Sequence, residues 1–249
     1  MRLYVFIVFC ISVFGCKTHL KAQENPSKIE KSFLKVKIKS GTQEATFLKK
    51  SGEKYKARIT FPENLQDQAR HELIIALHWA GDFGTYKEFN DCLVVPGFKN
   101  LEAIIVSPEG ETQLWNTKNN VEKVLSIIEN SQKFWNVNPK KIAIMGYSNG
   151  GNGSWYFAEK HPELFSAAIP MAGLYRITEQ IDVPIYAIQG AQDELFPLKK
   201  SRHWVEKTKD AGSDVTFVVN EKLSHFQGCS YIEELDKASE WLKNIWKEK

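Results

Sequence analysis

The sequence predicts an α/β fold in which a mostly parallel central sheet carries helices on both faces. Short, continuous apolar runs recur from residue 73 onward, and stretches of helix length separate them. Runs without polar and apolar alternation suit strands that are covered on both faces, as in a parallel sheet. Regular alternation of such strands with helices is typical of doubly wound sheets. A chain of 249 residues is long enough to bury the core of one such domain.

The N-terminal residues differ from the rest of the chain. Residues 3–14 form an apolar run that fits the central region of a signal peptide and is too short to span a bilayer. The run ends in the sequence VFGC at Val13–Cys16, which resembles a bacterial lipoprotein box. We therefore expect residues 1–15 to be a signal peptide and Cys16 to carry a lipid that anchors the chain to a membrane. An ordinary secretory signal cut after Ala22 is the alternative, and both interpretations predict an exported protein, in the first case in the periplasm or at the cell surface.

The sequence of the next segment predicts a flexible tether followed by two half-exposed strands. Residues 16–32 are polar and lack apolar periodicity, so we expect a flexible tether that leads into one domain at residues 33–249. Residues 32–39 and 55–61 alternate apolar and polar side chains with a two-residue period. This period predicts half-exposed antiparallel strands at the edge of the sheet.

The remaining elements follow from the apolar runs and the helix-length stretches between them. The runs predict six buried strands: residues 73–77, 103–106, 142–145, 167–169, 185–188 and 215–219. The stretches that predict the clearest helices are residues 119–135, 149–160, 198–211 and 232–246.

Charge and motif content exclude several classes of function. The 33 basic and 30 acidic residues are spread along the chain without a long basic block, so we expect no nucleic-acid partner. The sequence has no zinc-binding motif, no clustered carboxylates at ligand spacing, no phosphate-binding loop and no dinucleotide fingerprint. We therefore expect neither a metal nor a cofactor.

The strongest motif is GYSNG at Gly146–Gly150, which directly follows a predicted buried strand and opens a predicted helix. In this context a serine on a strained turn projects its hydroxyl above the sheet, and the flanking glycines let strand and helix pass close together. The motif predicts that Ser148 is a nucleophile.

The region from Leu73 to His225 resembles the α/β-hydrolase superfamily, in particular its small bacterial carboxylesterase, phospholipase and feruloyl or polyhydroxyalkanoate esterase branches. The resemblance implies the order nucleophile, acid, base, which Ser148, Asp193 and His225 supply. Asp193 follows the strand at residues 185–188, and His225 follows the last predicted strand. Glu194 is the competitor for the acid. The resemblance implies that residues 33–249 are a serine hydrolase domain that forms an acyl-enzyme.

The resemblance also implies an oxyanion hole made of two backbone NH groups. The first comes from the residue after the nucleophile, Asn149. The second comes from the loop HWAGD at His78–Asp82, which resembles the HGxG turn of the superfamily in its first and fourth positions. Alignment points to Ala80, and a shifted loop would use Trp79 instead. We assign no chemical role to His78.

About ten residues separate the strand ending near Gly173 from the next strand near Val183, where the superfamily usually inserts a cap. We expect no cap domain and an open cleft, in which Trp115 forms either an apolar or sugar-stacking wall or plain packing. Such a cleft suits a bulky ester, for instance an acylated polysaccharide or a lipid. Two rival interpretations are a peptidase or acyltransferase with the same triad and a surface lipoprotein that has kept the fold as a binding module.

Export would place the remaining cysteines, Cys92 and Cys229, in an oxidising compartment. The sequence leaves open whether they form a disulfide or stay as buried thiols, because it does not show how close they lie.

Overall fold

A computed structural model describes residues 25–65, 70–177 and 179–249. The predicted signal peptide, the lipid site at Cys16 and the first part of the predicted tether lie outside the described residues. Within the described part of the chain, no helix is long and apolar enough to cross a membrane.

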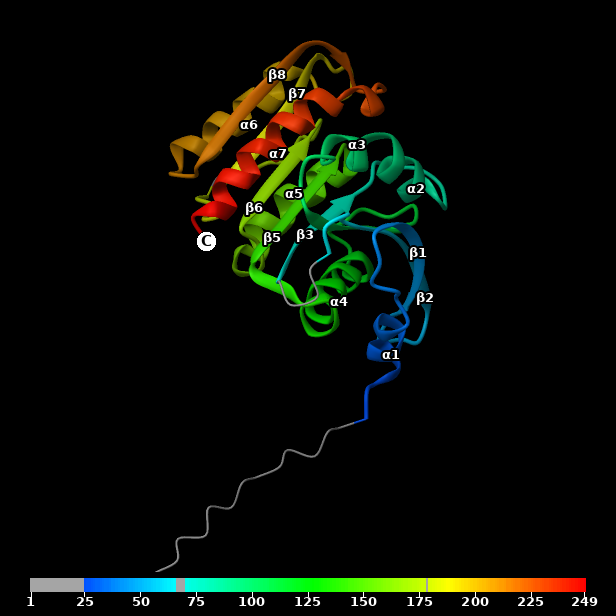
Figure 1. The fold of residues 1–249 in the computed structure, drawn as a ribbon. Helices are drawn as coiled ribbons and strands as arrows, with labels where there is room; N and C mark the ends of the chain where they lie inside the picture. Colours follow the sequence, from blue (N-terminus) through cyan, green and yellow to red (C-terminus); the bar gives the residue numbers. More distant parts are fainter. Residues whose placement is uncertain (1–24, 66–69, 178) are drawn as a thin grey trace, which may run out of the picture.

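The centre of the molecule is a sheet of eight strands, and it confirms the predicted mostly parallel α/β architecture (Figure 1). The strand order is β1-β2-β4-β3-β5-β6-β7-β8. β1 and β2 pair antiparallel, β2 and β4 also pair antiparallel, and every later pairing is parallel. The strands are β1 (Gly41–Leu48), β2 (Lys54–Phe61), β3 (His71–Leu77), β4 (Ala103–Pro108), β5 (Val137–Tyr147), β6 (Ala167–Met171), β7 (Ile185–Gln192) and β8 (Val215–Ser224).

Helices cover both faces of the sheet. One face packs against α1 (Lys28–Leu34), α4 (Lys118–Phe134), α5 (Asn149–Lys160) and α6 (Leu198–Asp210). The other face packs against α2 (Thr85–Phe89), the π-helical turn η1 (Asn90–Val94) and α7 (Ile232–Lys247). Short turns complete the chain at α3 (Val95–Gly97), η2 (Pro162–Leu164) and η3 (Gly228–Ser230).

The strand β3 shows why continuous apolar runs predicted the central strands. Leu73, Ile75 and Leu77 enter the core under α4 and α5, whereas Ile74 and Ala76 enter the core under α7. Alternate side chains of one strand point to opposite faces, so a strand between two helical layers needs an apolar side chain at every position. All six runs predicted as buried strands lie in strands, and the four predicted helices correspond to α4, α5, α6 and α7 with ends that differ by at most one residue.

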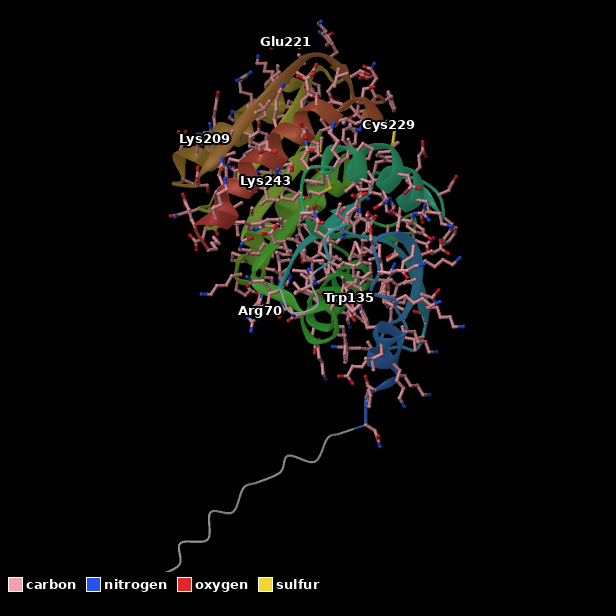
Figure 2. All side chains as sticks on the ribbon, in the orientation of Figure 1. Arg70, Trp135, Lys209, Glu221, Cys229 and Lys243 are labelled. Atoms are coloured by element: carbon pink, nitrogen blue, oxygen red, sulfur yellow. A yellow bond between two sulfur atoms is a disulfide. The ribbon has the colours of Figure 1, made fainter. Side chains whose placement is uncertain are left out.

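The prediction of a strand at residues 32–39 is wrong, because α1 occupies Lys28–Leu34 and the first strand is β1. Ser27 and Glu30 form a capping box, in which each side chain accepts a hydrogen bond from the other residue's backbone NH. Phe33 of this helix stacks on Phe47 at 4.1 Å between ring centroids and contacts Trp135, which is labelled in Figure 2. Residues 28–32 of the segment predicted as the tether are therefore helical.

The connection from β6 to β7 spans residues 172–184 and is too short to contain a cap domain. Cys92 of η1 and Cys229 of η3 form a disulfide with a Cα–Cα distance of 5.3 Å (Figure 2). The bond joins two segments that are 137 residues apart in the sequence.

Candidate active site

Ser148 occupies the turn between β5 and α5 in a strained conformation. β5 ends at Tyr147, α5 begins at Asn149, and Ser148 between them has φ 56° and ψ −115°. A non-glycine residue at positive φ costs free energy and persists only where its surroundings fix it. Here the backbone NH of Ser148 donates to the carbonyl of Met171 at 2.9 Å. Gly150 is required as well, because a Cβ at this position would overlap the carbonyl oxygen of Leu77.

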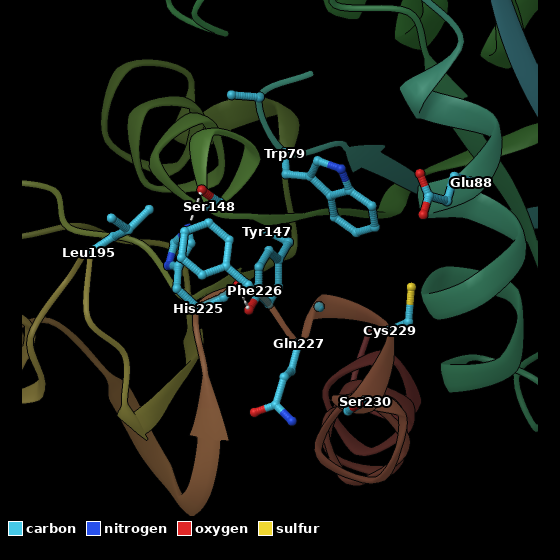
Figure 3. A pocket seen from close by; sticks show the side chains of 12 residues that line it. Trp79, Glu88, Tyr147, Ser148, Leu195, His225, Phe226, Gln227, Cys229 and Ser230 are labelled. Atoms are coloured by element: carbon cyan, nitrogen blue, oxygen red, sulfur yellow. Dashed lines mark hydrogen bonds between the residues drawn. The ribbon is translucent and has the colours of Figure 1, made fainter. Parts of the chain in front are cut away.

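The structure brings Ser148, His225 and Asp193 together in one chain of hydrogen bonds (Figure 3). The distance from Ser148 Oγ to His225 Nε2 is 2.8 Å, and the distance from His225 Nδ1 to Asp193 Oδ2 is 2.9 Å. An ionised carboxylate only accepts hydrogen bonds, so the proton of the imidazole lies on Nδ1. Nε2 is then free to accept a proton from the serine hydroxyl, which is the arrangement that a general base requires.

Three further donors fix the carboxylate of Asp193. Gln189 Nε2 donates to Oδ2 at 2.8 Å, and the backbone NH groups of Leu195 and Phe196 donate to Oδ1 at 3.0 and 2.6 Å. The carboxylate is buried, so these bonds hold its orientation toward His225. Gln189 was not singled out from the sequence, although it lies four residues before Asp193 at the end of the same strand.

The backbone of His225 is held by two side chains. Its NH donates to Glu194 Oε2 at 3.1 Å, and its carbonyl accepts a hydrogen bond from the Tyr147 hydroxyl at 2.9 Å. Burial raises the pKa of Tyr147, which keeps this phenol protonated as a donor. Glu194, the competitor for the acid, therefore contacts the main chain of His225 and not its ring. Tyr147 was missed because it occupies the first x position of the GxSxG motif, where no particular residue type is required.

His78 and Trp115 form a buried support for the loop after β3. His78 Nδ1 donates to the Trp79 carbonyl at 2.5 Å, and its Nε2 accepts from the NH of Gly110 at 2.9 Å. Burial lowers the pKa of His78 from 6.5 to about 4, so the ring is neutral. The Trp115 indole NH donates to the His78 carbonyl at 2.9 Å.

The prediction that Trp115 forms a wall of the substrate cleft is wrong. Trp115 is only 1% exposed, and it does not line the cavity at Ser148. Its ring packs edge-on against His78 with 5.2 Å between ring centroids. The plain packing that the sequence left open as the alternative is what the structure has.

A cavity of about 580 Å³ opens at Ser148. Trp79 and Ala80, the two candidates for the second oxyanion donor, both line it, and Asn149 begins α5 beside it. The other lining residues come from α2, from the end of β5, from the loop after β7 and from the segment around His225: Glu88, Tyr147, Leu195, Phe226, Gln227, Gly228, Cys229 and Ser230. Figure 3 shows these side chains around Ser148 and His225.

Comparison with known proteins gives one family and several structural relatives. The model of the Dienelactone hydrolase family matches residues 94–240. Protein usf of Aquifex pyrophilus is 34% identical over 116 residues, which cover 43% of this chain and 50% of that protein, so this chain spans half the length of this relative.

Two solved structures share the arrangement of strands and helices. A thermostable esterase superposes with a TM-score of 0.69 at 22% identity, covering 82% of this chain and 62% of that chain. A ferulic acid esterase superposes with a TM-score of 0.68 at 17% identity, covering 84% of this chain and 100% of that chain. At these identities the similarity concerns the fold.

Proposed function

This chain belongs to the dienelactone hydrolase family and has the α/β-hydrolase fold, and we propose that it hydrolyses carboxylic esters through an acyl-enzyme on Ser148. The observation that carries the proposal is the continuous hydrogen-bond chain from the Ser148 hydroxyl through His225 to Asp193. A serine hydroxyl is a weak nucleophile until an adjacent base accepts its proton, and this geometry supplies the base and the carboxylate that orients it.

The reaction proceeds in two steps that use the same residues. Ser148 Oγ attacks the ester carbonyl while His225 Nε2 takes the hydroxyl proton, and the imidazolium then gives this proton to the departing alkoxide. The acyl group remains on Ser148. Water attacks the acyl-enzyme with His225 again as base, which releases the carboxylic acid and restores the serine.

We further propose that the NH groups of Asn149 and Ala80 stabilise the oxyanion. Asn149 is the first residue of α5, where helix NH groups have no intrahelical partner. The carbonyl of Trp79 accepts a hydrogen bond from His78, and in a trans peptide the following NH points the opposite way. Because the Trp79 carbonyl points toward the His78 ring, the NH of Ala80 in the same peptide points away from that ring. This orientation favours Ala80 over Trp79 as the second donor.

The proposed substrate is a bulky ester, such as an acylated polysaccharide or a lipid. The short connection at residues 172–184 supports this proposal, because it leaves the cavity without a cap. Phe226 is 73% exposed and Leu195 is 52% exposed, and both line the cavity. Exposed apolar side chains at a cavity mouth favour an apolar or aromatic group of the substrate.

Export and membrane anchoring are a separate part of the proposal. The apolar run at residues 3–14 and the lipoprotein box at Val13–Cys16 support it. The disulfide between Cys92 and Cys229 also supports it, because disulfides persist mainly in oxidising compartments.

A panel of chromogenic substrates tests the proposed reaction. We expect hydrolysis of p-nitrophenyl esters of rising acyl length, with a burst of p-nitrophenol equal to the enzyme concentration wherever deacylation is slow. p-Nitroanilides of the same acids and added alcohol acceptors distinguish a peptidase and an acyltransferase from a hydrolase. Acetylated and feruloylated sugars are tested beside this panel. If neither the p-nitrophenyl esters nor these sugars are hydrolysed, the proposal is refuted.

A further inference from the structure

We propose that Glu88 makes the cavity selective by charge, so that esters carrying a cationic or neutral group react faster than esters carrying a second, anionic carboxylate. This inference rests on the proposed ester hydrolysis and names the class of substrate that the site prefers. Glu88 acts here as a specificity-determining residue and takes no part in the bond-making steps.

The cavity has an apolar side and an acidic side. In Figure 3 the side chains of Leu195 and Glu88 lie on opposite sides of Ser148, and Phe226 lies near His225. Glu88 extends from α2 toward Trp79 (Figure 3). Ser148 and Glu88 line the same cavity, so an ester that is bound with its carbonyl at Ser148 and extends across the cavity brings its far end toward Glu88.

The carboxylate of Glu88 forms no ion pair in the part of the chain that the structure describes. Among the described residues that line the cavity there is no lysine and no arginine, and Glu88 is the one acidic residue. Among residues 25–65, 70–177 and 179–249, none forms an ion pair or a side-chain hydrogen bond with the Glu88 carboxylate. Its neighbour Lys87 binds Glu44, with 2.6 Å between Nζ and Oε2. The carboxylate is therefore free to interact with a ligand.

The surroundings of Glu88 suit a cation better than an anion. Trp79 lines the same side of the cavity and is held by edge-on contacts with Phe89 and Tyr147, at 5.3 and 5.9 Å between ring centroids. An indole ring and a carboxylate both attract an ammonium group, whereas a carboxylate repels an anionic substrate. Because Glu88 is exposed to solvent, we expect an effect on kcat/KM of about two- to fivefold for each unit of substrate charge.

Two matched series of substrates measure this selectivity on each side of the ester bond. In the alcohol series, acetylcholine is compared with its neutral isostere 3,3-dimethylbutyl acetate and with 4-acetoxybutanoate. In the acyl series, the p-nitrophenyl esters of 4-trimethylammoniobutanoate, 5,5-dimethylhexanoate and glutarate are compared. We expect kcat/KM in at least one series to follow the order cationic, neutral, anionic, and high salt to weaken the difference.

Variants assign the effect to Glu88. Glu88→Gln keeps the size of the side chain but removes its charge, so the kcat/KM ratios between cationic, neutral and anionic esters should approach one. Glu88→Lys should reverse the order, so that anionic esters react fastest. Glu206→Gln removes the same charge from an exposed position on α6 and should leave the ratios unchanged. Charge ratios that are equal in wild type and Glu88→Gln would overturn this inference while ester hydrolysis stands. Failure to hydrolyse the neutral esters would overturn the proposed function and this inference together.

Discussion

At the scale of single residues, the site assigns different tasks to two neighbouring acids. Asp193 accepts a hydrogen bond from the His225 ring, whereas Glu194 accepts one from the His225 main chain. The sequence placed both directly after a strand and favoured Asp193, but it kept Glu194 as a competitor, because their order along the chain does not show which side chain turns inward. The orientation depends on Gln189 and on the NH groups of the following turn.

Substitution of the two acids should separate these tasks. Asp193→Asn should lower kcat by about 10⁴-fold, because an amide at this position favours the wrong tautomer of His225. Glu194→Gln retains an acceptor for the His225 NH and should stay close to wild type, and Glu194→Ala should lose less than about tenfold. Steady-state kinetics with one p-nitrophenyl ester gives all three values. A larger loss for Glu194→Gln than for Asp193→Asn would move the acid to Glu194.

His78 should stay neutral at pH values where an ordinary histidine is charged. Its folded-state pKa of about 4 lies below the usual 6.5, so the unfolded chain binds a proton between these values and the folded chain does not. This residue therefore lowers the stability of the fold as the pH falls from about 6.5 to 4, by up to about 3 kcal/mol. NMR titration of the histidine side chains should find His78 protonated only on Nδ1 at pH 5.5. Titration of its ring near pH 6.5 would contradict the buried arrangement.

At the scale of elements, the prediction from sequence succeeded for strands buried on both faces of the sheet and for the long helices that cover it. The strands from β3 to β8 and the helices α4 to α7 came from apolar runs and from the stretches between them. The prediction failed at α1, where the alternation in residues 32–39 suggested a strand. The signal that could have identified the helix is the Ser27 and Glu30 pair, which has the spacing of a capping box.

The capping box predicts a local contribution to stability. Ser27→Ala removes the acceptor for the Glu30 NH and should lower the free energy of unfolding by about 1 kcal/mol. The triad does not contact α1, so the specific activity of the folded protein should not change. Urea unfolding curves of the two proteins measure the difference. Equal midpoints would contradict this contribution of the capping box.

At the scale of the whole molecule, the site depends on contacts that no local pattern reveals. The triad residues Ser148, Asp193 and His225 follow three different strands. Their contact was predicted only because they occur along the chain in the order nucleophile, acid and base of the superfamily that the sequence resembles. The wall of the cavity was less predictable. Glu88 lies in α2, directly before η1, and Ser230 lies in η3. Both residues reach the cavity only because η1 and η3 pack together. Trp115, chosen from its loop, turned out to support His78 from within the core.

The disulfide between Cys92 and Cys229 should be a substantial part of the stability of the molecule. A crosslink between segments 137 residues apart restricts the unfolded chain strongly, and loss of such a bond typically costs about 2–5 kcal/mol. The double variant Cys92→Ser and Cys229→Ser should therefore unfold at lower urea concentration than wild type. Reduction of the wild-type protein should reproduce this loss, and reduction of the double variant should have no further effect. Unchanged unfolding on reduction of wild type would contradict this role.

The central claim is that Ser148 is a nucleophile activated by His225 and Asp193, and covalent labelling tests it most directly. A fluorophosphonate reacts only with an activated serine, so the protein should gain one adduct per chain, which peptide mass spectrometry should locate on Ser148. Ser148→Ala should gain none, while Ser230→Ala, which changes another serine of the same cavity, should be labelled like wild type. No labelling of the folded wild-type protein, or labelling that persists in Ser148→Ala, would contradict the account.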